Sequence, residues 1–231
     1  MNLTMAILAG GLGTRLGEVC RDRPKALVEV AGAPFIHHQM RLLKKNGFQK
    51  VVVLAGYLGE MIEHSVGDGS AFGLEVSYSF DWPILLGTGG ALVKALPLLS
   101  DRFMVIYGDS YLDLDYRTVA EAFFSCSQPA LMTVYRNDDN YDRSNVVFQD
   151  GVIALYDKTS HQPDMHHIDY GLGCLQASVL TGREGNFDLA EIYTQLSREG
   201  RLAGFEILNR FYEIGSLSGL AELETILTQT T

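Results

Sequence analysis

LAGGLGTRL, at Leu8–Leu16, is the most informative stretch of this sequence, and PKAL follows it at Pro24–Leu27. The run before the glycines, Met5–Ala9 (MAILA), is apolar throughout and predicts a buried strand. Glycines directly after such a strand let backbone N–H groups approach an anion closely, as loops that cradle phosphate do. We therefore expect a strand that runs into a phosphate-binding loop.

Three phosphate-binding chemistries and a plain glycine-rich turn compete for this loop. A Walker A loop would end in Gly-Lys-Ser/Thr, whereas Gly17 is followed by Glu18. A dinucleotide loop needs a helix straight after the glycines, which Pro24 and Lys25 would break. The third alternative is a loop around a nucleoside triphosphate, in which Arg15 makes bidentate contacts and Lys25 acts as a compact charge. The spacing of these two cations favours the third alternative.

The rest of the chain alternates short apolar runs with segments of helical period, which predicts an α/β fold with a largely parallel sheet. Lys50–Leu54 and Phe103–Tyr107 are further strands of this kind. A hairpin is expected at Asn145–Gln149 and Val152–Asp157, around the turn Asp150-Gly151. We expect a single domain over 1–231, with a nucleotide-binding half to about 109 and a sugar-phosphate-binding half from about 110.

Composition and charge exclude several classes of protein. The 231 residues are 47% hydrophobic and 20% charged, as in ordinary globular proteins. A net charge of −10 argues against a general nucleic-acid or anionic-membrane binder. The cysteines, Cys20, Cys126 and Cys174, are odd in number and form no metal-binding pair. With no secretory signal expected at the start of the chain, we predict a cytoplasmic protein.

The sequence resembles the sugar-1-phosphate nucleotidylyltransferases. The resemblance covers nearly the whole chain and is carried by GGLGTRL at Gly10–Leu16, PKAL at Pro24–Leu27, LGTGGAL at Leu86–Leu92 and YGD at Tyr107–Asp109. Within that family the chain looks most like the bacterial D-glycero-D-manno-heptose 1-phosphate guanylyltransferases. The resemblance implies a Rossmann-like three-layer α/β/α fold with a mixed, mostly parallel central sheet.

The family resemblance also implies a reaction and a nucleotide site. A sugar-1-phosphate oxygen attacks the α-phosphate of a nucleotide and pyrophosphate leaves in line, so catalysis rests on alignment and charge neutralisation. Arg15 and Lys25 are the expected catalytic cations. The residues expected to contact the nucleotide are Leu8, Ala9, Gly10, Gly11, Gly13, Thr14, Asp81, Gly87 and Thr88.

Magnesium is the cofactor that the resemblance implies, with Asp109 and Glu213 as its ligands. Asp109 follows a predicted central strand, at the strand end where ligands gather in open α/β sheets. Glu213 stands where most relatives have an aspartate, so its carboxylate has one extra methylene. Mg²⁺ is usually held by one or two carboxylates together with substrate phosphates, so two acids suffice.

The sugar 1-phosphate is expected to meet Lys158, Asn145, Asp169 and Gly171. Relatives have Glu-Lys-Pro where this chain has Asp157-Lys158-Thr159, so the lysine matches and the proline does not. A carboxylate such as that of Asp169 accepts hydrogen bonds from sugar hydroxyls.

Trp82 has two interpretations, a stacking partner for the base or an anchor of the hydrophobic core, and the sequence favours the core anchor. The expected partners of the protein are an NTP, with GTP ahead of CTP and UTP, and a heptose or hexose 1-phosphate. A homodimer is compatible with the sequence. The alternative function is a non-catalytic nucleotide-sugar-binding or regulatory module of the same fold.

Overall fold

The computed structural model describes residues 3–229, apart from the side chain of Arg15. These residues form two compact units that do not follow chain order. Within the described residues, unit 1 comprises 3–85, 106–113 and 211–229, and unit 2 comprises 86–105 and 114–210. Each unit is therefore assembled from segments that lie far apart in the sequence.

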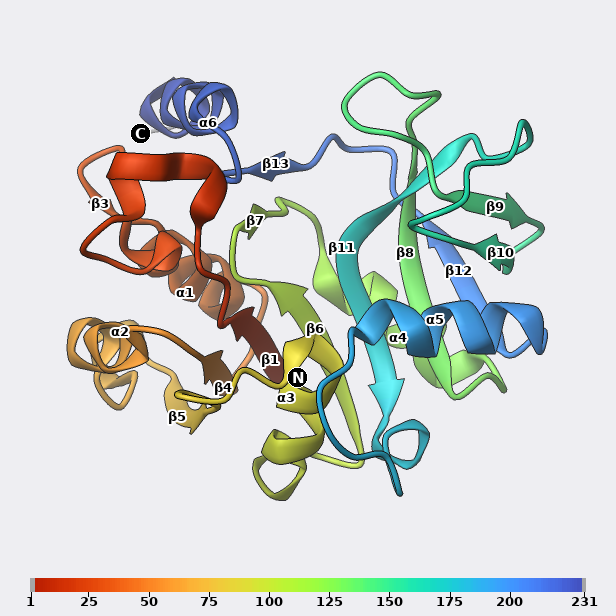
Figure 1. Ribbon diagram of the computed structural model, residues 1–231, viewed down its shortest axis with the longest axis horizontal. Coiled ribbons are helices and arrows are strands. Elements are labelled where there is room, and N and C mark those ends of the chain that lie inside the picture. The colour runs from red at the N-terminus through yellow and green to blue at the C-terminus, as the bar shows by residue number, and fades with distance from the viewer. Residues whose placement is uncertain (1–2, 230–231) are drawn as a thin grey trace. The chain divides into compact units, whose positions relative to one another are not determined.

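Unit 1 carries the parallel part of the sheet, in the order β5-β4-β1-β6 (Figure 1). Its elements are β1 (Thr4–Ala9), β2 (Glu29–Val30), β3 (Ala33–Pro34), α1 (Phe35–Lys45), β4 (Lys50–Ala55), α2 (Gly59–Val66), β5 (Glu75–Phe80), β7 (Ser110–Tyr111), β13 (Tyr212–Glu213) and α6 (Leu217–Gln229). The short 3-10 helices Thr14–Cys20 (η1), Lys25–Leu27 (η2) and Ser70–Phe72 (η3) lie between them.

Unit 2 carries the mixed part of the sheet, in the order β6-β11-β8-β12-β10-β9. Its elements are α3 (Gly87–Ala95), α4 (Tyr116–Ser125), β8 (Ala130–Arg136), β9 (Val146–Gln149), β10 (Val152–Tyr156), β11 (His167–Gln176), α5 (Leu189–Arg198) and β12 (Leu202–Glu206), with the 3-10 helices Leu96–Leu98 (η4) and Ala177–Val179 (η5). Strand β6 (Arg102–Tyr107) contributes residues to both units.

The local signals in the sequence correspond to these elements. Met5 and Ile7 in β1 are completely buried, as a continuous apolar strand requires. The predicted hairpin is the pair β9–β10, and Asp150 and Gly151 in its turn both have positive φ. The expected α/β fold class with a large mixed central sheet is confirmed. Among residues 3–229, no helix has the length and apolar character needed to cross a bilayer.

Candidate active site

The glycine loop leaves the carboxyl end of β1, as the sequence predicts. Leu8 and Ala9 end the strand, and the carbonyl of Leu8 accepts a hydrogen bond from the N–H of Gly108 at 2.9 Å. Gly13 has a φ of 64°, and its carbonyl accepts the N–H of Leu16 at 3.0 Å. Thr14 then begins a 3-10 helix instead of a continuous α-helix, which is unlike a dinucleotide-binding loop.

Glycine is required at two positions of this region because other atoms approach closely. A Cβ on Gly13 would lie 3.0 Å from the Sγ of Cys20 and 3.6 Å from the Cβ of Lys25, so the loop lies against the base of the Lys25 side chain. A Cβ on Gly108 would lie 2.8 Å from the carbonyl oxygen of Leu8. By contrast, Gly11 has no atom near its Cβ position, so packing does not explain the glycine there.

Lys25 and Asp109 form an ion pair, with 2.7 Å between Nζ and Oδ2. Their side chains are only 15% and 23% exposed, which weakens solvent screening of the pair. Lys25 begins the 3-10 helix after Pro24, and Asp109 follows Gly108 at the carboxyl end of β6. The structure thus brings a predicted catalytic cation onto a predicted metal ligand. The side chain of Arg15, the other expected cation, lies outside the described residues.

The buried amide of Gln39 supports the turn that carries Asp109. Gln39 lies on α1 and is 2% exposed. Its Nε2 donates to the carbonyl oxygens of Tyr107 at 3.1 Å and Ser110 at 2.9 Å, one on each side of the Gly108-Asp109 dipeptide. Gln39 was not among the residues predicted for the site. The signal was a polar side chain in the middle of the apolar face of a helix.

Glu213 lies on the strand that pairs with the residues after Asp109. Strands β13 and β7 are antiparallel, with Glu213 opposite Ser110. The N–H of Ile214 donates to the carbonyl of Asp109 at 2.9 Å. The chemistry of this pair of acids, oxygen donors only, suits Mg²⁺, which completes its shell with phosphate and water.

Asp81 extends the same edge of the sheet in unit 1. It follows β5, is 8% exposed, and its N–H donates to the carbonyl of Ala55 at 3.2 Å. Gly56, which follows β4, lies between Asp81 and the glycine loop. A Cβ on Gly56 would be 2.8 Å from the Gly10 carbonyl oxygen and 3.2 Å from Oδ1 of Asp81. Gly56 is a second residue that the sequence analysis missed.

Gly87 and Thr88, expected at the nucleotide, lie in unit 2 at the start of α3. A Cβ on Gly87 would be within 2.4 Å of the Phe187 carbonyl oxygen, so a larger residue would push these segments apart. The Thr88 hydroxyl lies 3.1 Å from Oδ1 of Asp188 and accepts the N–H of Leu189 at 2.8 Å. The contacts of Thr88 therefore join α3 to the start of α5.

The residues expected at the sugar phosphate gather in unit 2. The Asn145 side-chain oxygen accepts the N–H of Asp169 at 3.1 Å, and Oδ1 of Asp169 accepts the N–H of Gly171 at 3.0 Å. Gly171 has a φ of 95°, which a larger side chain disfavours. Burial raises the pKa of Asp169, while the charge of Lys158 opposes that rise. The four predicted residues are thus linked by hydrogen bonds and electrostatics.

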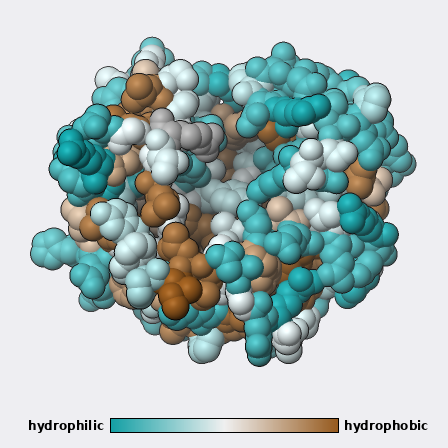
Figure 2. Space-filling model, in the orientation of Figure 1, coloured by the Kyte–Doolittle hydropathy of each residue, from teal (hydrophilic) through white to brown (hydrophobic). Residues whose placement is uncertain are grey.

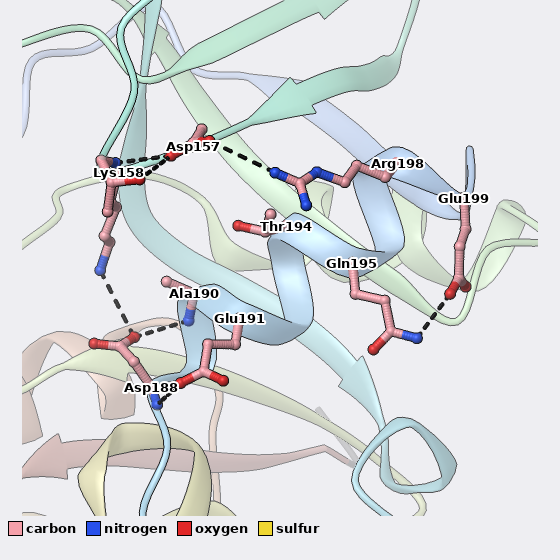
Figure 3. A pocket seen from close by; sticks show the side chains of 10 residues that line it. Asp157, Lys158, Asp188, Ala190, Glu191, Thr194, Gln195, Arg198 and Glu199 are labelled. Carbon is pink, nitrogen blue, oxygen red and sulfur yellow. Dashed lines mark hydrogen bonds and ion pairs between the residues drawn. The ribbon is translucent and has the colours of Figure 1, made fainter.

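Lys158 forms an ion pair with Asp188 beside a groove, and the neighbouring Asp157 fixes the turn that carries it (Figure 3). Its Nζ lies 3.8 Å from Oδ1 of Asp188, the N-cap of α5. Asp157 accepts the N–H groups of Thr159 at 2.8 Å and Ser160 at 3.0 Å, so its carboxylate fixes the turn where relatives have proline. The hydrogen bond from the Thr159 hydroxyl, followed by these two N–H groups, lowers the pKa of Asp157.

The groove beside Lys158 has a volume of about 610 Å³ and runs along α5. Arg198, near the end of α5, points toward Asp157, with 3.7 Å between Nη2 and Oδ2. Asp188 is the third residue that the sequence analysis missed at this site. Its spacing to Glu191, three residues on, is typical of a helix cap, but only the fold reveals its contacts with Lys158 and Thr88.

Comparison with known proteins places the chain in a family. The family model for nucleotidyl transferases matches residues 5–220. An N-acetylmuramate alpha-1-phosphate uridylyltransferase of Neisseria meningitidis is 28% identical over 95% of this chain and 96% of its own length. A D-glycero-alpha-D-manno-heptose 1-phosphate guanylyltransferase of Campylobacter jejuni is 33% identical over 66% of this chain and 67% of its own. The structure of HddC from Yersinia pseudotuberculosis, also solved with GMP-PN, has a TM-score of 0.84, 25% identity and coverage of 97% and 99%.

Proposed function

The chain belongs to the nucleotidyl transferase family, as a sugar-1-phosphate nucleotidylyltransferase, and from this premise we propose that it transfers a guanylyl group from GTP to a heptose or hexose 1-phosphate. An oxygen of the sugar phosphate forms a bond to the α-phosphorus, the bond from that phosphorus to the β-phosphate oxygen breaks, and pyrophosphate leaves. The observation that carries the proposal is the Lys25–Asp109 ion pair against the glycine loop.

The glycine loop and Lys25 are assigned to the triphosphate. Backbone N–H groups of Gly10, Gly11 and Gly13 donate to phosphate oxygens, and the bare Cα of Gly11 leaves room for that approach. Lys25 places an ammonium in a partly desolvated setting, where its attraction to negative charge is stronger than in water. Arg15 is assigned to the same phosphates from its place in the sequence, as the second residue of the 3-10 helix Thr14–Cys20 that follows the glycines.

Asp109 and Glu213 are assigned to Mg²⁺. When bound, the ion neutralises charge on the transferring and leaving phosphates. The pairing of β7 with β13 and the Gln39 hydrogen bonds hold the backbone that carries both acids. Lys25 compensates the charge of Asp109.

Lys158, Asp169 and Asn145 are assigned to the sugar 1-phosphate. Lys158 attracts the phosphate and keeps the attacking oxygen in reach, while Asp169 accepts hydrogen bonds from ring hydroxyls. Asn145 fixes the backbone of Asp169, and the Asp157 turn fixes that of Lys158.

Asp81 favours guanine over uracil. Guanine presents N1–H and N2–H₂ side by side, which matches the two acceptors of a carboxylate. Uracil presents one N–H between two carbonyl oxygens, which a carboxylate repels. UTP is nevertheless the second candidate, because the Neisseria uridylyltransferase matches almost the whole chain. We assign the product to cell-surface polysaccharide synthesis and the enzyme to the cytoplasm. The three cysteines are free thiols, as is usual for proteins of that reducing compartment.

The test is pyrophosphate release from GTP, UTP and CTP with a panel of heptose, hexose and N-acetylated 1-phosphates, with and without Mg²⁺. We expect turnover that needs Mg²⁺, is lost on addition of EDTA, and is fastest with GTP. Fastest turnover with UTP would replace the nucleotide assignment and leave the reaction standing. Nucleotide binding without turnover over the full panel would instead support a non-catalytic binding module.

A further inference from the structure

Trp82 and Tyr57 form an exposed aromatic pair in unit 1. Their ring centroids are 5.1 Å apart at an interplanar angle of 59°. Trp82 is 52% exposed and Tyr57 is 40% exposed. The sequence-based preference for Trp82 as a core anchor is therefore wrong, because about half of its surface faces solvent. The ring is available to a ligand.

The loops that carry Tyr57 and Trp82 follow strands that end at the same edge of the parallel sheet as the strand before the glycine loop. In the register of the strands, Ala9 lies opposite Ala55, and Ala55 lies opposite Phe80. These residues are the last of β1, β4 and β5, so the three loops that follow these strands begin side by side. Tyr57 is the second residue after β4, and Trp82 is the second residue after β5.

The three loops touch one another where they leave the strands. The Cβ position of Gly56 is 2.8 Å from the carbonyl oxygen of Gly10 and 3.2 Å from Oδ1 of Asp81. Tyr57 and Trp82 are the next residues after Gly56 and Asp81, so they lie one residue away from this contact. The aromatic pair thus adjoins the loop assigned to the phosphates.

The loops after β1 and β5 also expose large apolar side chains. Leu12 in the glycine loop is 50% exposed, and Ile84 is 75% exposed. Figure 2 shows hydrophobic residues gathered around the segment that follows β5. Large apolar side chains gathered in this way at a loop edge are typical of a surface that covers a ligand. A nucleobase has flat apolar faces and a polar edge. Trp82 offers an aromatic ring to such a face, and the adjacent Asp81 offers a carboxylate that can accept hydrogen bonds from the edge.

We propose that the indole ring of Trp82 stacks on the base of the bound nucleotide and that Tyr57 fixes the orientation of that ring. The proposal rests on the proposed function, because the glycine loop must hold the phosphates of the same nucleotide. Stacking tolerates any base, since each has a π-face. Trp82 therefore supplies affinity, and the choice of base falls to Asp81.

Tryptophan fluorescence tests the proposal directly, because Trp82 is the one tryptophan of the sequence. Emission is recorded while the protein is titrated with GTP or UTP in the presence of Mg²⁺, and in parallel with inorganic tripolyphosphate, which has no base. Calorimetry measures binding of the same compounds independently. We expect both nucleotides to quench the emission as they bind, and tripolyphosphate to leave it unchanged.

Three variants and one matched control sharpen the test. Trp82→Ala is expected to weaken nucleotide binding about 5- to 100-fold, the range of a lost base-stacking contact. Trp82→Phe keeps an aromatic face and stays within a few-fold of the wild type. Tyr57→Leu keeps the fluorophore and weakens the quenching. The control is Phe124→Ala on α4, which removes another aromatic side chain, 51% exposed, and is expected to change nothing.

Each contrary outcome has a separate meaning. Nucleotides that bind by calorimetry without quenching, and with equal affinity in the wild type and Trp82→Ala, would overturn the stacking proposal and leave the proposed function intact. Absence of nucleotide binding in the wild type would remove both. If Trp82→Ala binds nucleotide normally but changes the mass measured by light scattering, the surface is a contact between two copies of the chain and the proposal is wrong. If Trp82→Ala does not fold, the wild-type titration decides alone.

Discussion

Lys25 is the positively charged residue that the structure places beside both the glycine loop and Asp109. We expect Lys25→Ala to lower kcat by about 10²–10³-fold, the usual cost of removing one charge-stabilising group from an active site. The matched control is Lys45→Ala, which removes an exposed ion pair with Asp113 in the same unit, at 3.6 Å. Steady-state kinetics with GTP check the prediction. Loss of activity in both variants to the same degree would assign Lys25 a general electrostatic role and no contact with phosphate.

A substitution at Gly11 can distinguish a role in packing from a role in phosphate binding. No atom lies within 4 Å of its Cβ position, so Gly11→Ala is expected to leave the thermal midpoint nearly unchanged. If backbone N–H groups here approach phosphate, the added methyl group weakens GTP binding about tenfold or more. Thermal unfolding and calorimetry on the same preparation test the two halves of the prediction. Unchanged affinity would place the phosphates elsewhere.

Asp169 gives a prediction for pH. Burial raises its pKa in the folded protein, so its contribution to stability is greatest below the ordinary value of about 4 and is lost as pH rises through the folded pKa. At neutral pH the ionised carboxylate therefore destabilises the fold. We expect Asp169→Asn to raise the thermal midpoint at pH 7, to lose this advantage near pH 4, and to lower activity.

The control for Asp169 is Asp164→Asn, which changes an exposed carboxylate in the same unit. Midpoints measured from pH 3 to 8 should superimpose for this variant and the wild type. An Asp169→Asn protein that is less stable than the wild type at pH 7 would mean that attraction to Lys158 outweighs the cost of burial.

At the scale of elements, the sequence predicted those with strong local signals. The buried run of β1 and the capping box of α5 could be read directly, because strand burial and helix capping depend on neighbouring residues. The roles of Gln39 and Asp188 could not be predicted. Gln39 bonds a residue 68 positions further along the chain, and Asp188 pairs with Lys158, 30 positions before it. Only the assembled fold brings these residues together.

Asp188 is the helix cap whose removal should affect binding as well as stability. Asp188→Ala and Asp115→Ala each remove an N-cap, of α5 and α4, and each is expected to cost about 1 kcal/mol. Because Asp188 also holds Lys158, its removal should raise KM for the sugar phosphate several-fold while kcat changes less. Denaturant unfolding and kinetics measure both effects. Equal kinetics in the two variants would limit Asp188 to capping.

At the scale of the whole molecule, the division into units explains which site residues could be grouped from the sequence. Proximity along the chain placed the glycine loop near Lys25, and the hairpin motif placed Asn145 near Lys158. It could not show that residues 211–229 belong to unit 1 and that Tyr212–Glu213 pair with the strand after Asp109. Glu213 was predicted only through the family resemblance, since no local pattern connects it with residue 109.

The return of the C-terminal segment makes the candidate metal site depend on a distant part of the core. Ile214 and Leu223 are fully buried against Val30 and Phe35, from the first part of the chain. Leu223→Ala should therefore cost about 2–5 kcal/mol of unfolding free energy through the cavity it leaves. The matched control on the same helix is Leu217→Ala, because Leu217 is 62% exposed and its loss leaves no buried cavity.

Leu223→Ala should also weaken the response to Mg²⁺ and GTP. Ligands that bind only the folded protein stabilise it by about 2.7 kcal/mol at 100 times their dissociation constant. Because α6 packs against β13, the strand that ends in Glu213, loosening this helix should reduce the stabilisation by ligand as well as the stability of the free protein. Denaturant midpoints of Leu223→Ala and Leu217→Ala, each with and without Mg²⁺ and GTP, measure it. An equal stabilisation by Mg²⁺ and GTP in both variants would show that ligand binding does not depend on the packing of α6, and would contradict this prediction.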